Sequence, residues 1–238
     1  MGLSILMRSN MPMRLQFENK LHELQNDILK MGQMVEKQVQ LALKTLETVD
    51  KVLAHEVIHG DSAVNAQRFL IEEKCVELIA TQQPAARDLR TIIAVMNMIV
   101  DLEQMGDQAK EIVRCVLQLP ENPKRSQPTE LKQMGEMVSV MLSQVLAAYH
   151  ENSAILAEVI AKQDRDIRDL YTRLFSYIIE NMAETKKRKR VLEAYEILRA
   201  AQKLERIGDL ATNIAERVIY VATGKMQEIN VEPDERKN

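Results

Sequence analysis

Two segments of this chain match each other, Leu102-Glu103-Gln104-Met105-Gly106-Asp107 and Leu204-Glu205-Arg206-Ile207-Gly208-Asp209, and they lie 102 residues apart. The match continues downstream, where Ile112 and Val116 correspond to Ile214 and Val218. Upstream, Asp61-x-x-Val64 corresponds to Asp164-x-x-Ile167 at an offset of 103. A repeat that spans most of each half predicts a duplicated structural unit.

The composition favours helices in both halves. Aromatic residues make up only 3% of the 238 residues, and the chain has 7 glycines, 6 prolines and 14 methionines. Such a chain is poor in turn-forming and strand-forming residues. Helix-start residues (Pro12, Asp50 and Pro84) and the stop residue Gly224 then delimit the elements. The expected helices span about 13–47, 51–81, 85–119, 129–150, 152–183 and 187–223.

We therefore predict an all-α fold made of two tandem, pseudo-symmetric three-helix bundles. Three prolines between residues 120 and 128 indicate the linker between them. The expected units are an N-terminal extension, a first repeat, the Pro-rich linker, a second repeat and a polar tail that is disordered from Val231 on. Their ranges are 1–12, 13–119, 120–128, 129–224 and 225–238.

Charge and hydropathy exclude two classes of protein. The formal net charge is −3, whereas a generic nucleic-acid binder is usually strongly basic. No run of 18 apolar residues occurs, so we expect no insertion into a membrane. Cys75 and Cys115 do not suggest a disulfide framework; they fit a reduced, cytoplasmic setting and are expected to fill the core.

Carboxylates occupy positions where a core residue is expected. On a helical wheel of residues 85–119, Glu103 and Asp107 fall in the apolar sector, and Glu205 and Asp209 repeat the arrangement. Asp61, which corresponds to Asp164, lies in the apolar stripe of the preceding helix. The apolar sector of residues 85–119 consists of Leu89, Ile92, Ile93, Met96, Ile99 and Val100. The apolar stripe of the preceding helix consists of Val57, Val64, Ile71, Cys75 and Leu78.

Two interpretations account for these carboxylates. Oxygen-rich clusters suit hard or borderline cations such as Mg, Mn, Fe or Zn. The alternative is a network of buried carboxylates and arginines, because a carboxylate on a core face must be paired, hydrogen-bonded or metal-bound. Gly106 and Gly208 would allow a neighbouring helix or a ligand to approach closely. The candidate arginines are Arg68, Arg90, Arg168 and Arg199.

Two further motifs carry weaker signals. His55-Glu56-Val57-Ile58-His59 matches the H-E-x-x-H pattern of zinc peptidases. Because Val57 lies on the core stripe, both histidines are expected on the solvent face, where at most adventitious metal would bind. The basic block Lys186–Arg190 is either a solvated helix start or a contact for an acidic partner or a phosphate group.

The sequence resembles the PhoU family of bacterial and archaeal phosphate-signalling regulators. The resemblance covers about residues 14–224. It rests on two stretches of sequence. One is Leu204-Glu205-Arg206-Ile207-Gly208-Asp209 with the residues Ala211, Asn213, Ile214, Ala215 and Glu216 that follow it, and the other is Gln83-Pro84-Ala85 with Asp88-Leu89-Arg90.

The resemblance implies a cytoplasmic negative regulator of phosphate uptake and signalling that is not an enzyme. Such a protein connects the ATPase of the phosphate ABC transporter to a sensor histidine kinase and forms a homodimer or a higher homo-oligomer. Some members bind iron or zinc at paired acidic residues on the second and third helix of each half. In this sequence that implies Glu103, Asp107, Glu205, Asp209, Asp61 and Asp164 as metal ligands.

The chain departs from the family pattern on the second helix of each half. The second acidic position there is Asn65 in one half and Arg168 in the other, and the position after each Gly-Asp, commonly His, is Gln108 and Leu210. These departures motivate an alternative, a related scaffold that regulates a different transporter.

A second alternative is a metal-dependent enzyme of the helical-bundle class. Di-iron sites of that class include two Glu-x-x-His motifs. Gly106 and Gly208 stand at the histidine positions after Glu103 and Glu205, which argues against this alternative.

Overall fold

The structure is a computed structural model that describes residues 3–119, 127–185 and 187–229, with side chains described from residue 14 onward. These residues form six helices and contain no strand. The all-α prediction is therefore confirmed. The helices are α1 (Leu3–Thr48), α2 (Lys51–Gln82), α3 (Ala86–Gln118), α4 (Thr129–His150), α5 (Ala154–Glu184) and α6 (Arg188–Thr223).

The predicted end signals of two helices are confirmed. The Asp50 carboxylate accepts hydrogen bonds from the backbone N–H groups of Val52 (2.9 Å) and Leu53 (3.1 Å), so it caps α2. Gly224 ends α6 in the left-handed conformation, with φ of 75°, which glycine adopts without steric cost. The proposed tail beyond Asn230 and most of the linker lie outside the described residues.

The predicted start of the first helix is wrong. α1 begins at Leu3 rather than at residue 13, so Pro12 lies inside the helix instead of in its first turn. A proline inside a helix removes one backbone hydrogen bond and is costly. The flanking sequence is rich in Leu, Met, Arg and Gln, which are strong helix formers, and the helix continues through the proline.

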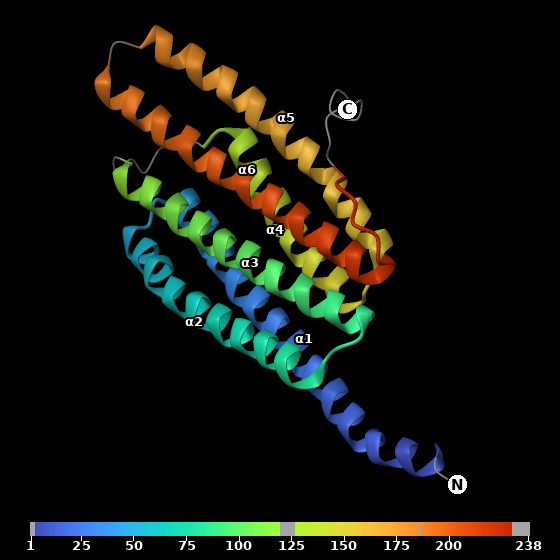
Figure 1. The fold of residues 1–238 in the computed structure, drawn as a ribbon. Coiled ribbons are helices and arrows are strands. Elements are labelled where there is room, and N and C mark those ends of the chain that lie inside the picture. Colours follow the sequence, from blue (N-terminus) through green and yellow to red (C-terminus); the bar gives the residue numbers. More distant parts are fainter. Residues whose placement is uncertain (1–2, 120–126, 186, 230–238) are drawn as a thin grey trace.

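The helices lie in two layers (Figure 1). In the front layer α2, α3, α6 and α5 lie side by side in that order, and α1 and α4 lie behind them. The two halves contact each other through α3 with α6, which is the most extensive contact, and through α1 with α4. Within the described residues, α2 and α5 contact only helices of their own half. These two helices therefore form the outer edges of the molecule.

A reciprocal pair of contacts relates α1 to α4. A Cβ added to Gly32 would lie 2.3 Å from Cδ2 of Leu146, and one added to Gly135 would lie 2.6 Å from Cδ2 of Leu43. Gly32 corresponds to Gly135 and Leu43 to Leu146, each at the repeat offset of 103. The duplication is thus a pseudo-two-fold relation in space, in which the glycine of each half receives the leucine of the other.

This contact predicts that Gly32→Ala destabilises the protein. Alanine raises helix propensity by about 1 kcal/mol, but overpacking against the Leu146 side chain costs about 1–3 kcal/mol. We expect a lower free energy of unfolding in urea titrations, and a double-mutant cycle with Leu146→Ala that shows favourable coupling. Gly60→Ala is the matched control, because its nearest neighbour, Nε2 of Gln38, is 3.3 Å from the added Cβ. A Gly32→Ala protein as stable as Gly60→Ala would contradict the contact.

Candidate functional site

The first carboxylate cluster lies between α2 and α3. Nζ of Lys110 is 2.5 Å from Oδ2 of Asp61 and 2.6 Å from Oδ1 of Asp107. Asp61 and Lys110 are mostly buried, whereas 43% of the Asp107 side chain is exposed. One ammonium group therefore joins a carboxylate of the outer helix to a carboxylate of the inner helix. We define the first cluster as Asp61, Asp107 and Lys110.

The second carboxylate cluster lies between α5 and α6. Nη2 of Arg168 is 2.9 Å from Oδ2 of Asp164 and 3.2 Å from Oδ1 of Asp209. Asp164 is only 1% exposed. Arg206 adds a more distant contact to Asp209, 3.7 Å from its Nη1 to Oδ2. We define the second cluster as Asp164, Asp209 and Arg168.

The two bridging cations remain charged in these surroundings. Burial alone lowers the pKa of Lys110, but the hydrogen bonds and charges of Asp107 and Asp61 outweigh it and the net pKa is raised. Burial acts in the same direction on Arg168, and the charges of Asp164 and Asp209 again raise the pKa. Each cluster therefore holds a full positive charge between two aspartates.

The two glutamates of the repeated motif have different partners. Nη1 of Arg68 is 3.7 Å from Oε1 of Glu103, which draws Glu103 toward an arginine on α2. The residue that corresponds to Arg68 is Tyr171. Within the described residues Glu205 forms no ion pair. Burial raises the pKa of Glu205, and the charge of Asp209 raises it further, while Arg168 lowers it.

Each motif glycine allows a close contact between helices. A Cβ on Gly106 would lie 2.8 Å from Oε1 of Gln38 and 3.9 Å from Oδ1 of Asp61. One on Gly208 would lie 2.9 Å from Cδ1 of Ile167 and 3.5 Å from Oδ1 of Asp164. The expected close approach is confirmed, and its partner is a neighbouring helix. The glycines let the aspartates of α2 and α5 reach α3 and α6.

The predicted site residues come together only in part. Asp61 meets Asp107, and Asp164 meets Asp209, as the repeat suggested. The apolar sector predicted for α3 is rotated from the true core, because Ile93 in it is 41% exposed. The helix buries instead a wide face that includes Val95, Met98, Leu102 and Met105.

Glu103 and Asp107 consequently stand at the edge of this core rather than inside it. They line the contact between α2 and α3, where side chains are partly open to solvent. We call this contact, and the contact between α5 and α6, the seam of each half. The stripe predicted for α2 is correct throughout: its five apolar residues are buried and Asp61 lies among them at 8% exposure.

Two of the four candidate arginines join the site. Arg68 contacts Glu103, and Arg168 bridges the second cluster. Arg199 contacts Glu196 (2.8 Å) and Glu111 (3.9 Å) instead. The Arg90 guanidinium lies beside Gly224 at the C-terminal end of α6, 3.4 Å from the position of an added Cβ, where a helix favours positive charge.

Sequence reasoning missed Lys110. Its position three residues after Asp107 places the two side chains on one face of α3, and an oppositely charged pair at that spacing was the available signal. The equivalent residue in the second half is Thr212, so comparison of the halves gave no hint of it.

The carboxylates do not form a conventional metal-binding group. Among the residues that the structure describes, no three side chains of His, Cys, Asp or Glu lie together in a way that could hold a metal ion. In each cluster the place between two aspartates is occupied by a nitrogen of Lys110 or Arg168. Iron or zinc at these residues stays a prediction, and the donors present do not fit a multinuclear cluster.

The remaining motifs lie away from the clusters. His55 and His59 are exposed, as the wheel predicted. Residues 187–190 are exposed at the start of α6, while Lys186 lies outside the described residues. Cys75 and Cys115 are fully buried, and burial raises the pKa of each thiol to about 12. Their role as core fillers is confirmed.

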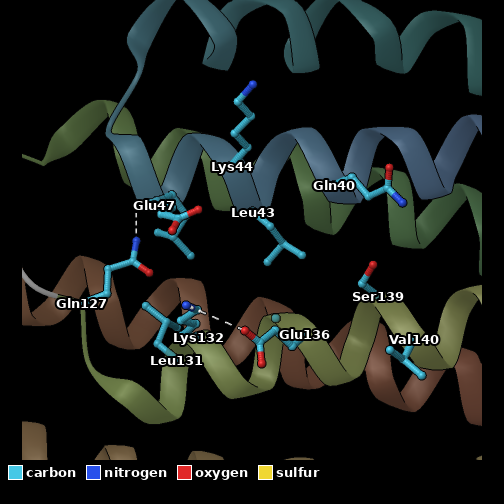
Figure 2. Close-up of a pocket in the computed structure, with 12 residues that line it drawn as sticks. Gln40, Leu43, Lys44, Glu47, Gln127, Leu131, Lys132, Glu136, Ser139 and Val140 are labelled. Atoms are coloured by element: carbon cyan, nitrogen blue, oxygen red, sulfur yellow. Dashed lines mark hydrogen bonds and ion pairs between the residues drawn. The ribbon is translucent and has the colours of Figure 1, made fainter.

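A groove of about 660 Å³ runs between α1 and α4 on the back layer (Figure 2). Leu43 of α1 and Leu131 of α4 line it from opposite sides, and Lys132 and Glu136 of α4, which also line it, form an ion pair. It contains none of the predicted site residues. In the described part of the chain, no helix is both long enough and apolar enough to cross a membrane.

The fold and the two clusters define a class of protein, a duplicated three-helix bundle with one charged seam in each half. The family model of the PhoU domain matches residues 28–116 and 131–218, one segment in each of the two repeats. The chain belongs to the PhoU family.

Relatives match over nearly the whole length of the chain. The phosphate-specific transport system accessory protein PhoU homolog of Clostridium acetobutylicum is 36% identical, over 90% of this chain and 97% of the relative. The homolog of Pseudomonas aeruginosa is 37% identical, over 88% of this chain and 86% of the relative. The crystal structure of the phosphate transport system regulatory protein PhoU from Streptococcus pneumoniae superimposes with a TM-score of 0.83 at 35% identity. It covers 89% of this chain and 99% of that one.

The unpaired Glu205 predicts a pH-dependent gain in stability for Glu205→Gln. Because its folded pKa is raised above the usual 4.5, ionisation of Glu205 costs the folded state stability at neutral pH. The cost decreases as the pH falls through the raised pKa and is absent well below pH 4.5, where the side chain is protonated in both the folded and the unfolded state. We expect a higher Tm than wild type at pH 7 and no difference at acidic pH.

Glu103→Gln is the matched control for this experiment. Its carboxylate has Arg68 as a partner, so its removal is expected to give no gain at pH 7. Equal gains in Tm for both variants would show that the ion pair of Glu103 with Arg68, which Glu205 lacks within the described residues, does not affect stability.

Proposed function

We propose that this chain is a cytoplasmic negative regulator of phosphate uptake and phosphate signalling and catalyses no reaction. In this role it is an adaptor between the ATPase of the phosphate ABC transporter and a sensor histidine kinase. The observation that carries the proposal is full-length similarity to accessory proteins of the phosphate-specific transport system. The clusters also favour a structural role, since each ionised group in them is paired with an opposite charge.

The exposed faces of the outer helices support an adaptor with two partners. α2 exposes Phe69 and Val76, which are 58% and 54% accessible and line a shallow depression with Glu72, Glu73 and Glu77. α5 exposes Phe175 and Ile179 on one face. Exposed apolar side chains grouped on one face are typical of interaction surfaces.

The two outer faces differ in position and in the charged residues near them. They lie at opposite edges of the front layer (Figure 1), so two proteins can dock without overlap. Carboxylates surround the apolar pair on α2, whereas α5 runs toward the basic residues at the start of α6. A homodimer or higher oligomer, which the family resemblance implies, would use part of this surface and is measurable by light scattering.

Purified chain should capture both proposed partners in a phosphate-dependent manner. We expect the pair Phe69→Glu and Val76→Glu to weaken capture of one partner, and the pair Phe175→Glu and Ile179→Glu to weaken capture of the other. Introduced carboxylates on an apolar contact lose burial and repel acidic neighbours. Binding of the ATPase and of the kinase sensor region is measured at high and at low phosphate.

Val140→Glu on α4 is the control, because Val140 is also half exposed but lies outside both outer helices. The proposal fails if neither protein is captured at any phosphate concentration. Capture of the ATPase of another transporter instead would show that the chain regulates a transporter other than the phosphate transporter.

A further inference from the structure

The two halves place a cation at the same point from different helices. In the first cluster the cation is Lys110 of α3, and in the second it is Arg168 of α5. The corresponding residues are Thr212 in the second half and Asn65 in the first. Neither cation is part of the repeated pattern, yet each contacts the aspartate of the outer helix and the aspartate of the inner helix.

The geometry of each contact is that of a bridging ion. The two nitrogens lie within 2.5–3.2 Å of one oxygen from each aspartate. Two carboxylates held this close repel each other unless a positive charge lies between them. A divalent ion between the same oxygens would meet the ammonium or the guanidinium, so metal and side chain compete for one position.

We propose that this chain has replaced the metal that its family resemblance implies with side-chain cations of its own, Lys110 in the first half and Arg168 in the second. The inference rests on these contacts and not on the proposed adaptor function. In each seam, α2 with α3 and α5 with α6, a positive charge then offsets the repulsion between the two aspartates without metal, so the seam keeps its structure in the presence of a chelator.

Oxygens near Asp61 define what the first site would become without Lys110. Among the residues that the structure describes, Oδ1 of Asp61 and Oδ1 of Asn65, four residues further along α2, are buried and have no hydrogen-bond partner. Oε1 of Gln38 also has no partner in this described part of the chain, and it lies 2.8 Å from a Cβ added to Gly106, from which Oδ1 of Asp61 is 3.9 Å away. A set of carboxylate and amide oxygens suits a hard cation such as Mn²⁺ or Mg²⁺ rather than zinc in a thiolate site.

Removing a bridging cation should therefore create a metal requirement that the wild type lacks. Lys110→Thr copies Thr212, and Arg168→Asn copies Asn65, so each variant gives one half the residue of the other. In EDTA we expect both variants to unfold at a lower temperature than wild type, because two aspartates are left uncompensated. Added Mn²⁺ should restore the Tm of the variants, by binding only the folded state, and leave that of the wild type unchanged.

Direct binding measurements give the second readout. By isothermal titration with MnCl₂, each variant should bind at least about tenfold more tightly than wild type, equivalent to about 1.4 kcal/mol. Matched controls are Lys132→Thr on α4 and Arg114→Asn on α3, which remove the same charges from exposed ion pairs outside the clusters. Both controls should behave as wild type does.

Metal analysis of tag-free wild-type protein keeps the inference falsifiable even if a variant does not fold. Protein from cells grown with added iron, zinc and manganese should contain none of these metals in stoichiometric amount. Stoichiometric metal that is lost in Asp107→Asn or Asp209→Asn would overturn the proposal. Variants that neither lose stability nor gain Mn²⁺ affinity would overturn it as well, since the cations would then be surface pairs without a role in the seam.

Discussion

Asp61 and Asp164 each lie in the contact between an outer and an inner helix, and neighbouring residues compensate their negative charge. A carboxylate that is largely withdrawn from water is stable only beside a cation or several hydrogen-bond donors. Here a nitrogen within 2.9 Å meets each of them. Gly106 and Gly208 bring the helices close enough for that contact. Both outer helices are thereby fixed by a polar interaction as well as by the buried apolar stripe on either side of it.

The duplication preserves backbone geometry more strictly than chemistry. The contacts of Gly32 with Leu146 and of Gly135 with Leu43 are related by the repeat, and Arg206 donates a hydrogen bond to Gln104, its own counterpart, at 3.2 Å. These contacts lie between the halves, where a change on one side must fit both. The clusters lie within the halves, so each could change its cation independently.

Sequence patterns predicted most of the fold because helix ends and buried stripes are local properties. Asp50, Gly224 and the stripe of α2 were found in that way. The start of α1 was not, since a proline fits a first turn better than a helix interior but does not forbid the latter. The partners of the carboxylates also depended on tertiary structure. Arg68, Arg90, Arg168 and Arg199 were equivalent candidates in the sequence. The packing of α6 beside α3 brings Arg90 to Gly224 and Arg199 to Glu111, and Arg199 also pairs with Glu196 on its own helix.

The unlike clusters bear on how one chain could distinguish two partners, as the proposed adaptor function requires. Two halves with identical surfaces would present the same face twice and would discriminate poorly between partners, because specificity is a difference in binding free energy. In this chain the first half presents Arg68 and the carboxylates around the apolar pair on α2, whereas the second presents the exposed guanidinium of Arg168, Tyr171 and the basic residues at the start of α6. Tandem duplication followed by divergence of the seams and outer faces therefore gives one rigid scaffold two distinguishable sides.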